Sequence, residues 1–214
     1  MQTDSIELSF LSLFAFLTFC IFLIVSKYSY RTDNGILLDN DFSKPQSFHD
    51  EPISRSGGIA SIISLFVFFG IYYLLYSKIL YDYIFICSSL FLIGYLDDIK
   101  IKISANIRLM MMIVFLVTLI IILPIKIYSI DLIFLSLWLK KYIYSVIFVL
   151  ICLLFVVNGA NLIDGFNGLL AINLIIINSI LLSINLTNNN LEFSFFLTAQ
   201  IIVLTSFLIF NFPK

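Results

Sequence analysis

Seven apolar runs recur along this chain of 214 residues, each close to the length that a helix needs to cross a bilayer. They cover residues 8–25, 57–77, 79–96, 109–125, 142–157, 169–184 and 193–212. A spanning helix needs about 20 mostly apolar residues, with a working range of roughly 17–25. A backbone in lipid has no water to bond, so such runs form helices. The sequence therefore predicts an all-α, polytopic membrane helix bundle with about seven transmembrane helices.

The composition excludes an ordinary soluble domain, because 61% of the residues are hydrophobic and only 12% are charged. A water-soluble fold of this size has too little interior for so much apolar surface. The net charge is −1 and no basic tract is present, which argues against a nucleic-acid partner. The three cysteines lie inside apolar runs without metal-ligand spacing, so we expect them to be small buried hydrophobes.

Two segments leave alternatives open. The first run could be a signal peptide, but Asp4 and Glu7 stand where a basic region would be required, so we expect a retained helix. Residues 127–139 contain Asp131 and Trp138, and we expect an interfacial segment there, with part of a tilted helix as the alternative. The whole chain, residues 1–214, is predicted to be one transmembrane domain.

Lysine and arginine counting places the N-terminus outside, because eight of these residues then face the cytoplasm and four face out. The eight are Lys27, Arg31, Lys44, Arg55, Lys100, Lys102, Arg108 and Lys214, and the four are Lys78, Lys126, Lys140 and Lys141. With this orientation the cytoplasmic loops are residues 27–56, 97–107 and 158–168. Most polar and acidic residues fall in these loops, so one face of the membrane is predicted to carry the function.

An acid pair follows the third run. Asp97 and Asp98 are adjacent and would cost about 2.5–3.5 kcal/mol each at the centre of a bilayer, but little at its surface. A polar helix end would explain them. Adjacent carboxylates also repel, so one would hold its proton more tightly or both would attract a divalent cation.

A second polar stretch occupies residues 158–169. Asn158, Asn161 and Asp164 recur at every third position, which would place them on one face of a helix. Amide and carboxylate oxygens are ligands that Mg²⁺ prefers. A capped turn between two membrane helices needs fewer such residues than this stretch contains.

A third stretch, residues 44–60, contains His49, the only histidine, together with Arg55 and the pair Gly57-Gly58. Glycines and an arginine at the start of a helix suit a phosphate group. A solvated loop histidine and an arginine that only anchors the helix are the alternatives. Acid pair, oxygen ligands and phosphate-type residues on one face are together the parts of phosphoryl transfer.

These three stretches resemble the polyprenyl-phosphate N-acetylhexosamine-1-phosphate transferases, that is, glycosyltransferase family 4. The Asn-x-x-Asn-x-x-Asp-Gly-x-Asn-Gly-Leu pattern of residues 158–169 is the most specific element. The loop with Pro52, Arg55 and Gly57-Gly58 looks more like the branch that initiates O-antigen and other glycans than the phospho-N-acetylmuramoyl-pentapeptide transferase branch, which stays as an alternative.

The resemblance implies that undecaprenyl phosphate attacks a UDP-N-acetylhexosamine at the inner membrane of a bacterium, on its cytoplasmic face. The products are undecaprenyl-diphospho-sugar and UMP, with Mg²⁺ or Mn²⁺ as cofactor and a second copy of the chain as a further candidate partner. This reaction begins the assembly of cell-envelope glycans. The implied roles are catalytic for Asp97 and Asp98, metal-binding for Asn161 and Asp164, and substrate-binding for His49, Arg55, Asn158 and Asn167.

Two features depart from the family pattern. Many members carry Asp where this chain has Asn167, so a role that needs charge at this position is lost. Family members also continue beyond a stretch like residues 209–214 into a Gly-Asp motif and a histidine-bearing loop. We therefore expect the chain to be a fragment, or a truncated product that is inactive alone.

Other classes fit the pattern less well. A transporter or channel would place acids at mid-span, whereas Asp82 is the only acid within a predicted span and lies near its outer end. A prenyltransferase or CDP-alcohol phosphotransferase would show spaced Asp-x-x-Asp patterns. An inert structural subunit would leave the polar stretches unexplained.

Overall fold

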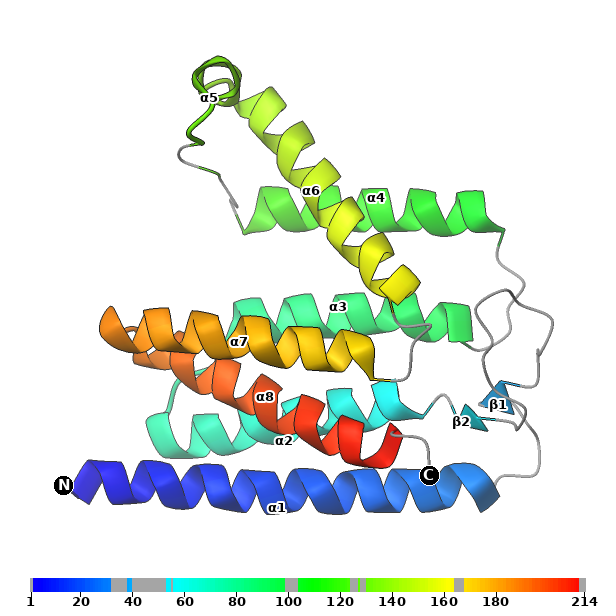
Figure 1. The fold of residues 1–214 in the computed structure, drawn as a ribbon, viewed down its shortest axis with the longest axis vertical. Coiled ribbons are helices and arrows are strands. Elements are labelled where there is room, and N and C mark those ends of the chain that lie inside the picture. Colours follow the sequence, from blue (N-terminus) through cyan, green and yellow to red (C-terminus); the bar gives the residue numbers. More distant parts are fainter. Residues whose placement is uncertain are drawn as a thin grey trace. The chain divides into compact units, whose positions relative to one another are not determined.

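The computed structural model describes residues 2–31, 38–39, 53–54, 56–98, 104–123, 127, 130–163 and 168–211. Within these residues the chain forms eight helices and one short antiparallel strand pair (Figure 1). The helices are α1 (Gln2–Arg31), α2 (Gly57–Tyr76), α3 (Tyr81–Asp98), α4 (Ala105–Ile122), α5 (Ile133–Leu139), α6 (Tyr142–Ile163), α7 (Leu169–Thr187) and α8 (Leu191–Asn211). The strands are β1 (Leu38–Asp39) and β2 (Ile53–Ser54).

Every apolar run is helical, which confirms the predicted helical membrane bundle. Many of these residues are β-branched or aromatic and are weak helix formers in water, but pairing of the backbone in lipid overrides that preference. Five helical segments of the described residues are long and apolar enough to span a membrane. They are Ser9–Tyr28, Gly57–Tyr76, Tyr142–Ala160, Leu169–Thr187 and Leu191–Asn211. The apolar parts of α3 and α4 are shorter, Tyr81–Leu92 and Asn106–Ile122.

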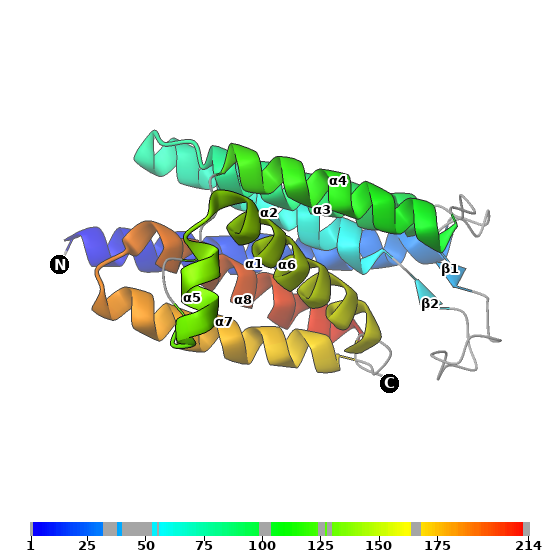
Figure 2. The same ribbon diagram turned by 90° about the horizontal axis from the view of Figure 1, so that it is seen from above.

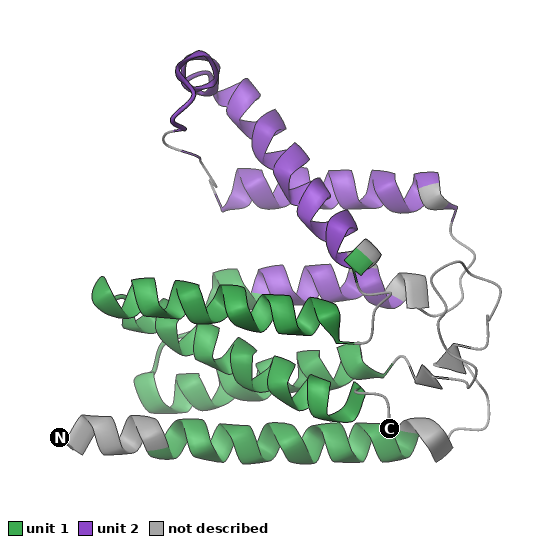
Figure 3. Cartoon of the chain, viewed as in Figure 1, with its two compact units in different colours: residues 1–84, 163–214 green, residues 85–162 purple. Residues whose placement is uncertain are grey.

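The chain divides into two compact units, which Figure 3 colours separately. Unit 1 comprises Met1–Ile84 and Ile163–Lys214, and unit 2 comprises Phe85–Leu162. Unit 1 therefore contains α1, α2, α7, α8 and the first turn of α3. Unit 2 contains the rest of α3, together with α4, α5 and nearly all of α6.

In unit 1, α8 packs against α1, α2 and α7, and α1 also packs against α2. Both views show α7 and α8 side by side as an antiparallel hairpin (Figures 1 and 2). The centre of α1 and α2 is aromatic: Phe68 is fully buried, with ring centroids 5.8 Å from Phe10 and 5.5 Å from Phe14. Small buried residues on α2 and α8, Ala60 and Ala199 among them, allow the close helix approach that membrane packing requires.

In unit 2, the buried side chains among the described residues lie on α4 and α6. They are Met112, Leu116, Leu119, Ile120, Ser145 and Val149. The Phe85 and Phe115 rings of α3 and α4 are 6.3 Å apart. The segment predicted to be interfacial contains α5, on which the Ile133 and Trp138 side chains are 79% and 64% exposed.

Candidate functional site

The acid pair terminates α3. The backbone places Asp97 and Asp98 as the last two residues of this helix, while their side chains lie outside the described part of the structure. The C-terminal end of a helix carries partial negative charge, so two carboxylates are unfavourable there. The last turn of α3 contains no basic residue to offset them. A bound cation would offset this charge at the end of α3.

Gly94, one turn before Asp98, is exposed. A methyl group added at Gly94 would meet no atom within 4 Å. Tyr95 stacks on Phe91 of the same helix with ring centroids 5.4 Å apart. The surface of α3 just before the acid pair is therefore open on the glycine side.

The second polar stretch begins as helix. We predicted residues 158–168 to be a loop, but α6 continues to Ile163 and includes Asn158 and Asn161. The Asn158 side chain is satisfied there because Nδ2 donates to the Leu154 carbonyl oxygen at 2.8 Å. Two amide residues three positions apart therefore share one face at the end of α6, as the spacing indicated. The Asn161 side chain, and Asp164 and Asn167 altogether, lie outside the described residues.

Gly168 connects this stretch to α7. It is the N-cap residue, it is buried, and its φ of 77° lies in the left-handed region that favours glycine. The left-handed conformation therefore explains why a glycine stands at position 168, which the sequence alone did not show.

The site residues of unit 2 stand on two helices. The acid pair ends α3, and Asn158 and Asn161 lie in the last two turns of α6. Ser104 caps the N-terminal end of α4, where its side chain accepts a hydrogen bond from Ile107 N at 3.5 Å.

The third stretch is only partly described. Strands β1 and β2 pair Leu38 with Ser54 and Asp39 with Ile53. In the sequence His49 lies between the two strands and Arg55 directly follows β2, and both are outside the described residues.

The paired glycines at the start of α2 have different surroundings. A methyl group at Gly57 would lie 2.5 Å from Cε2 of Phe207, so this glycine permits close contact between α2 and α8. Gly58 has no atom within 4 Å of such a group. Packing against α8 therefore accounts for Gly57, while the expectation that glycines at this helix start suit a phosphate group stays a prediction.

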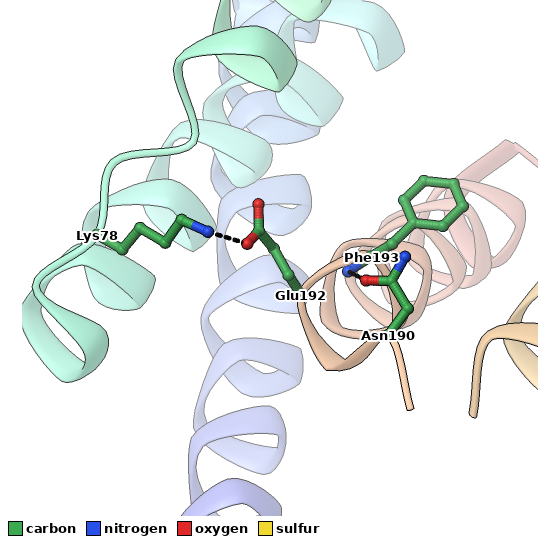
Figure 4. A network of polar contacts seen from close by, with 4 residues as sticks. All are labelled: Lys78, Asn190, Glu192 and Phe193. Carbon is green, nitrogen blue, oxygen red and sulfur yellow. Dashed lines mark hydrogen bonds and ion pairs between the residues drawn. The ribbon is translucent and has the colours of Figure 1, made fainter. Parts of the chain in front are cut away.

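Unit 1 contains two pairs of polar side chains that no sequence motif indicated, an ion pair and an interhelical hydrogen bond. Lys78, between α2 and α3, forms an ion pair with Glu192 in the first turn of α8 (Figure 4). The hydrogen bond from Lys78 to Glu192, and then the charge of Glu192, raise the pKa of Lys78. Asn190 accepts a hydrogen bond from Phe193 N at 3.4 Å beside this pair. Polar side chains therefore pair at the turns before α3 and α8 as well.

The other missed pair lies within the membrane-spanning helices, where Asn178 of α7 donates from Nδ2 to Oε1 of Gln200 of α8 at 3.0 Å. An amide in each of two consecutive apolar runs is the sequence feature that could have predicted this bond.

No group of three or more His, Cys, Asp or Glu residues forms a metal site among the described residues. At the site itself the available donors are carboxylate and amide oxygens of the two motifs. Such oxygen donors are those of a hard cation such as Mg²⁺.

Fold and site together define a multi-pass helical membrane protein with acids at the end of α3 and amides near the end of α6. The family model for glycosyl transferase family 4 matches residues 80–214, and the chain belongs to this family. The match includes the acid pair and residues 158–169, and it leaves out residues 44–60. No curated protein and no solved structure matches the chain. Membership makes the chain a sugar-phosphate transferase in general, with a polyprenyl phosphate acceptor and a nucleotide-sugar donor.

Proposed function

We propose that the chain transfers an N-acetylhexosamine-1-phosphate from a UDP-sugar to undecaprenyl phosphate in a bacterial plasma membrane. The observation that carries this proposal is the family match, which covers residues 80–214 and includes the acid pair at the end of α3 and Asn158 and Asn161 near the end of α6. Phosphoryl transfer depends mainly on positioning and on stabilising charge at the phosphate oxygens.

In the proposed reaction an oxygen of the lipid phosphate attacks the β-phosphorus of the UDP-sugar. A phosphorus–oxygen bond forms between the two, and the bond from the β-phosphorus to the bridging oxygen breaks. UMP leaves with that oxygen. The lipid then carries the sugar through a diphosphate made of its own phosphate and the transferred β-phosphate. Any proton on the attacking phosphate passes to a carboxylate.

We assign that carboxylate to Asp97, which accepts the proton or orients the lipid phosphate, with Asp98 beside it. Asn161 and Asp164 would hold Mg²⁺, or Mn²⁺ in its place. Asn158 and Asn167 would bind the nucleotide-sugar, with His49 and Arg55 from the loop before α2. The bound cation would neutralise charge that develops on the diphosphate.

Asn158 fits an acceptor role toward substrate. One N–H of its Nδ2 is donated to the Leu154 carbonyl oxygen, which orients the amide on its own helix. The other N–H is a second donor and Oδ1 is an acceptor, and Oδ1 suits a hydroxyl or N–H group of a nucleotide-sugar.

The activity test uses membranes that express the complete gene encoding this chain, supplied with undecaprenyl phosphate, Mg²⁺ and radiolabelled UDP-N-acetylglucosamine or UDP-N-acetylgalactosamine. We expect lipid-soluble label, and a fall of at least about 100-fold for Asp97→Asn and for Asp164→Asn. Asp82→Asn is the matched control, because Asp82 is an exposed acid in the first turn of the same helix α3. Equal activity of the Asp97 and Asp82 variants would refute the catalytic assignment.

The donor separates the two branches of the family. UDP-N-acetylmuramoyl-pentapeptide as the only donor that labels the lipid would assign the chain to the peptidoglycan branch and overturn the proposed substrate. Label from UDP-N-acetylhexosamine alone would support the glycan-initiating branch.

The cytoplasmic position of the active face has its own test. Single cysteines at Lys102 and at Lys141, in a background without Cys20, Cys87 and Cys152, should react from opposite sides of the membrane. We expect Lys102→Cys to label from the cytoplasmic side. Labelling of both from one side would contradict the proposed topology.

A further inference from the structure

The hydrogen bond between Asn178 and Gln200 differs from the other amide interactions in the spanning helices. Asn158, Asn173 and Asn185 each donate to the carbonyl oxygen four residues earlier in their own helix, at 2.8, 3.0 and 2.8 Å. Such bonds satisfy the amide without linking helices. Asn178 instead donates across to α8, and its side chain is buried with 8% exposure. Asn178 and Gln200, the amide pair, therefore join the two helices of the α7–α8 hairpin.

The amide pair lies at the middle of this hairpin. Asn189, in the turn, has a φ of 55° and is eleven positions from both Asn178 and Gln200. At about 1.5 Å per residue this distance is roughly 16 Å, about half of a hydrocarbon core that is ~30 Å thick. The pair is therefore at the depth where an unpaired amide has no water to bond.

This depth makes the pair sensitive to register. A slip of α7 along α8 by one turn, about 5.4 Å, would place both amides against apolar neighbours. Apolar contacts alone discriminate weakly between such registers, because Ile and Leu side chains along α7 are interchangeable and lipid is equally apolar. A single buried polar pair is a known way to fix the register of two helices.

The register of α7 sets the position of its first residues. α7 is continuous from Leu169 to Thr187, and Gly168 caps it with a left-handed conformation. Asp164 and Asn167, which we propose as metal and substrate ligands, directly precede this cap in the chain. α8 is itself fixed within unit 1, because Phe195 packs on Phe10 and Tyr72, and Phe207 lies at Gly57.

We infer that the amide pair fixes the height of α7 against α8, and thereby the position of the Gly168 cap, which belongs to the polar motif of residues 158–169, and that sugar-phosphate transfer depends on this height. Asn178 and Gln200 are positioning residues and do not touch substrate. The effect on sugar-phosphate transfer rests on the proposed function. The register of α7 against α8 does not, because both helices belong to unit 1.

The register is tested by disulfide formation in the full chain in membranes, without native cysteines. Ile175→Cys and Val203→Cys are both fourteen positions from Asn189, so we expect them to face each other and to cross-link on oxidation. Asn178→Leu or Gln200→Leu should lower the cross-linking yield several-fold. The exchange Asn178→Gln with Gln200→Asn restores one donor and one acceptor, and it should recover the yield. Asn185→Leu, which removes an amide bonded within α7, should leave the yield unchanged.

The transfer assay tests the second half. We expect kcat to fall at least tenfold in each leucine variant, with expression and thermal midpoint near those of the parent, and to recover in the exchange variant. A general structural defect would not be rescued by the exchange. Leucine variants with parental yield and parental kcat would overturn the inference, and a lowered yield with parental kcat would overturn its link to the site. If the parent protein shows no transfer, the proposed function fails, while the cross-linking still decides the register.

Discussion

Unit 1 and unit 2 differ in how their helices are held. In unit 1, four spanning helices share buried rings, small residues at close contacts, an ion pair and an interhelical hydrogen bond. In unit 2, none of the described α3 residues is buried, and those buried on α4 and α6 are the six named above. The acid pair and the first two amides belong to the sparsely packed unit 2.

The difference teaches that dense packing is confined to one unit, whereas the proposed site residues are shared: Asp97, Asp98, Asn158 and Asn161 belong to unit 2, and His49, Arg55, Asp164 and Asn167 belong to the residue ranges of unit 1. Elements with few buried contacts open at lower free energy and are the usual place for groups that bind and release ligands. Unit 1 is built as a scaffold, and the Gly168 cap connects it to the motif that begins in unit 2. Four substitutions test this division, and the largest effect is expected in the aromatic centre of unit 1.

Phe68→Ala should be the most destabilising change. The ring is fully buried and contacts Phe10, Phe14, Phe69 and Tyr72. In soluble proteins a Phe→Ala change in the core costs about 3–5 kcal/mol. We expect about 2–3 kcal/mol here, because lipid removes part of the transfer term. Phe155→Ala in unit 2, where the side chain is 76% exposed, should change the unfolding free energy little. Equal losses, measured by unfolding in mild detergent, would contradict the division.

Gly168→Ala should cost about 1–2 kcal/mol, because a β-carbon at a φ of 77° is strained. The matched variant is Gly159→Ala in α6, where an added methyl group meets no atom within 4 Å and alanine favours the helix. The thermal midpoints of the two variants should shift in opposite directions. A stabilised Gly168→Ala protein would show that the left-handed cap is absent in solution.

Gly57→Ala should have a smaller effect, of about 1 kcal/mol, because the Phe207 ring must move to admit the methyl group. Gly58→Ala, in open space one residue later, serves as the control and should be neutral or slightly stabilising. Adding Phe207→Leu to Gly57→Ala should recover part of the loss if the ring is the obstacle. Similar destabilisation by both glycine variants would point to backbone effects in place of the contact with α8.

Lys78→Met should have the smallest effect, since Lys78 is 58% exposed and exposed ion pairs contribute little. The pKa of Lys78 is raised in the fold, so its stabilising contribution is complete below the ordinary lysine value of 10.5 and is lost as the pH rises through the raised value. The parent and the variant should therefore differ most below that pH and converge above it. A difference in thermal midpoint that grows with pH would have the wrong sign for this ion pair.

Much of the fold was predictable because lipid imposes a strong rule on the backbone. All seven apolar runs are helical, and the turn of Asn188–Asn190 separates α7 from α8 as its polarity indicates. The motifs were recognisable in the sequence, since Asp97, Asp98 and residues 158–169 fall within the family match, and the roles of these residues stay predictions. The extension of α6 through Asn161 was not predictable, because asparagine also favours turns, and the bond from Asn158 to the Leu154 carbonyl appears only once the helix exists.

The sequence by itself determined that this chain is a bundle of membrane helices and that the acid pair Asp97 and Asp98 stands where an apolar run ends. Hydropathy and motif order are properties of the chain, and they survive any arrangement of the helices. Only the tertiary structure decided that Gly57 serves a contact with Phe207 and that Asn178 reaches Gln200. Those roles depend on which helices become neighbours, and in lipid that choice is made by shape and a few hydrogen bonds, which no linear pattern of apolar residues encodes.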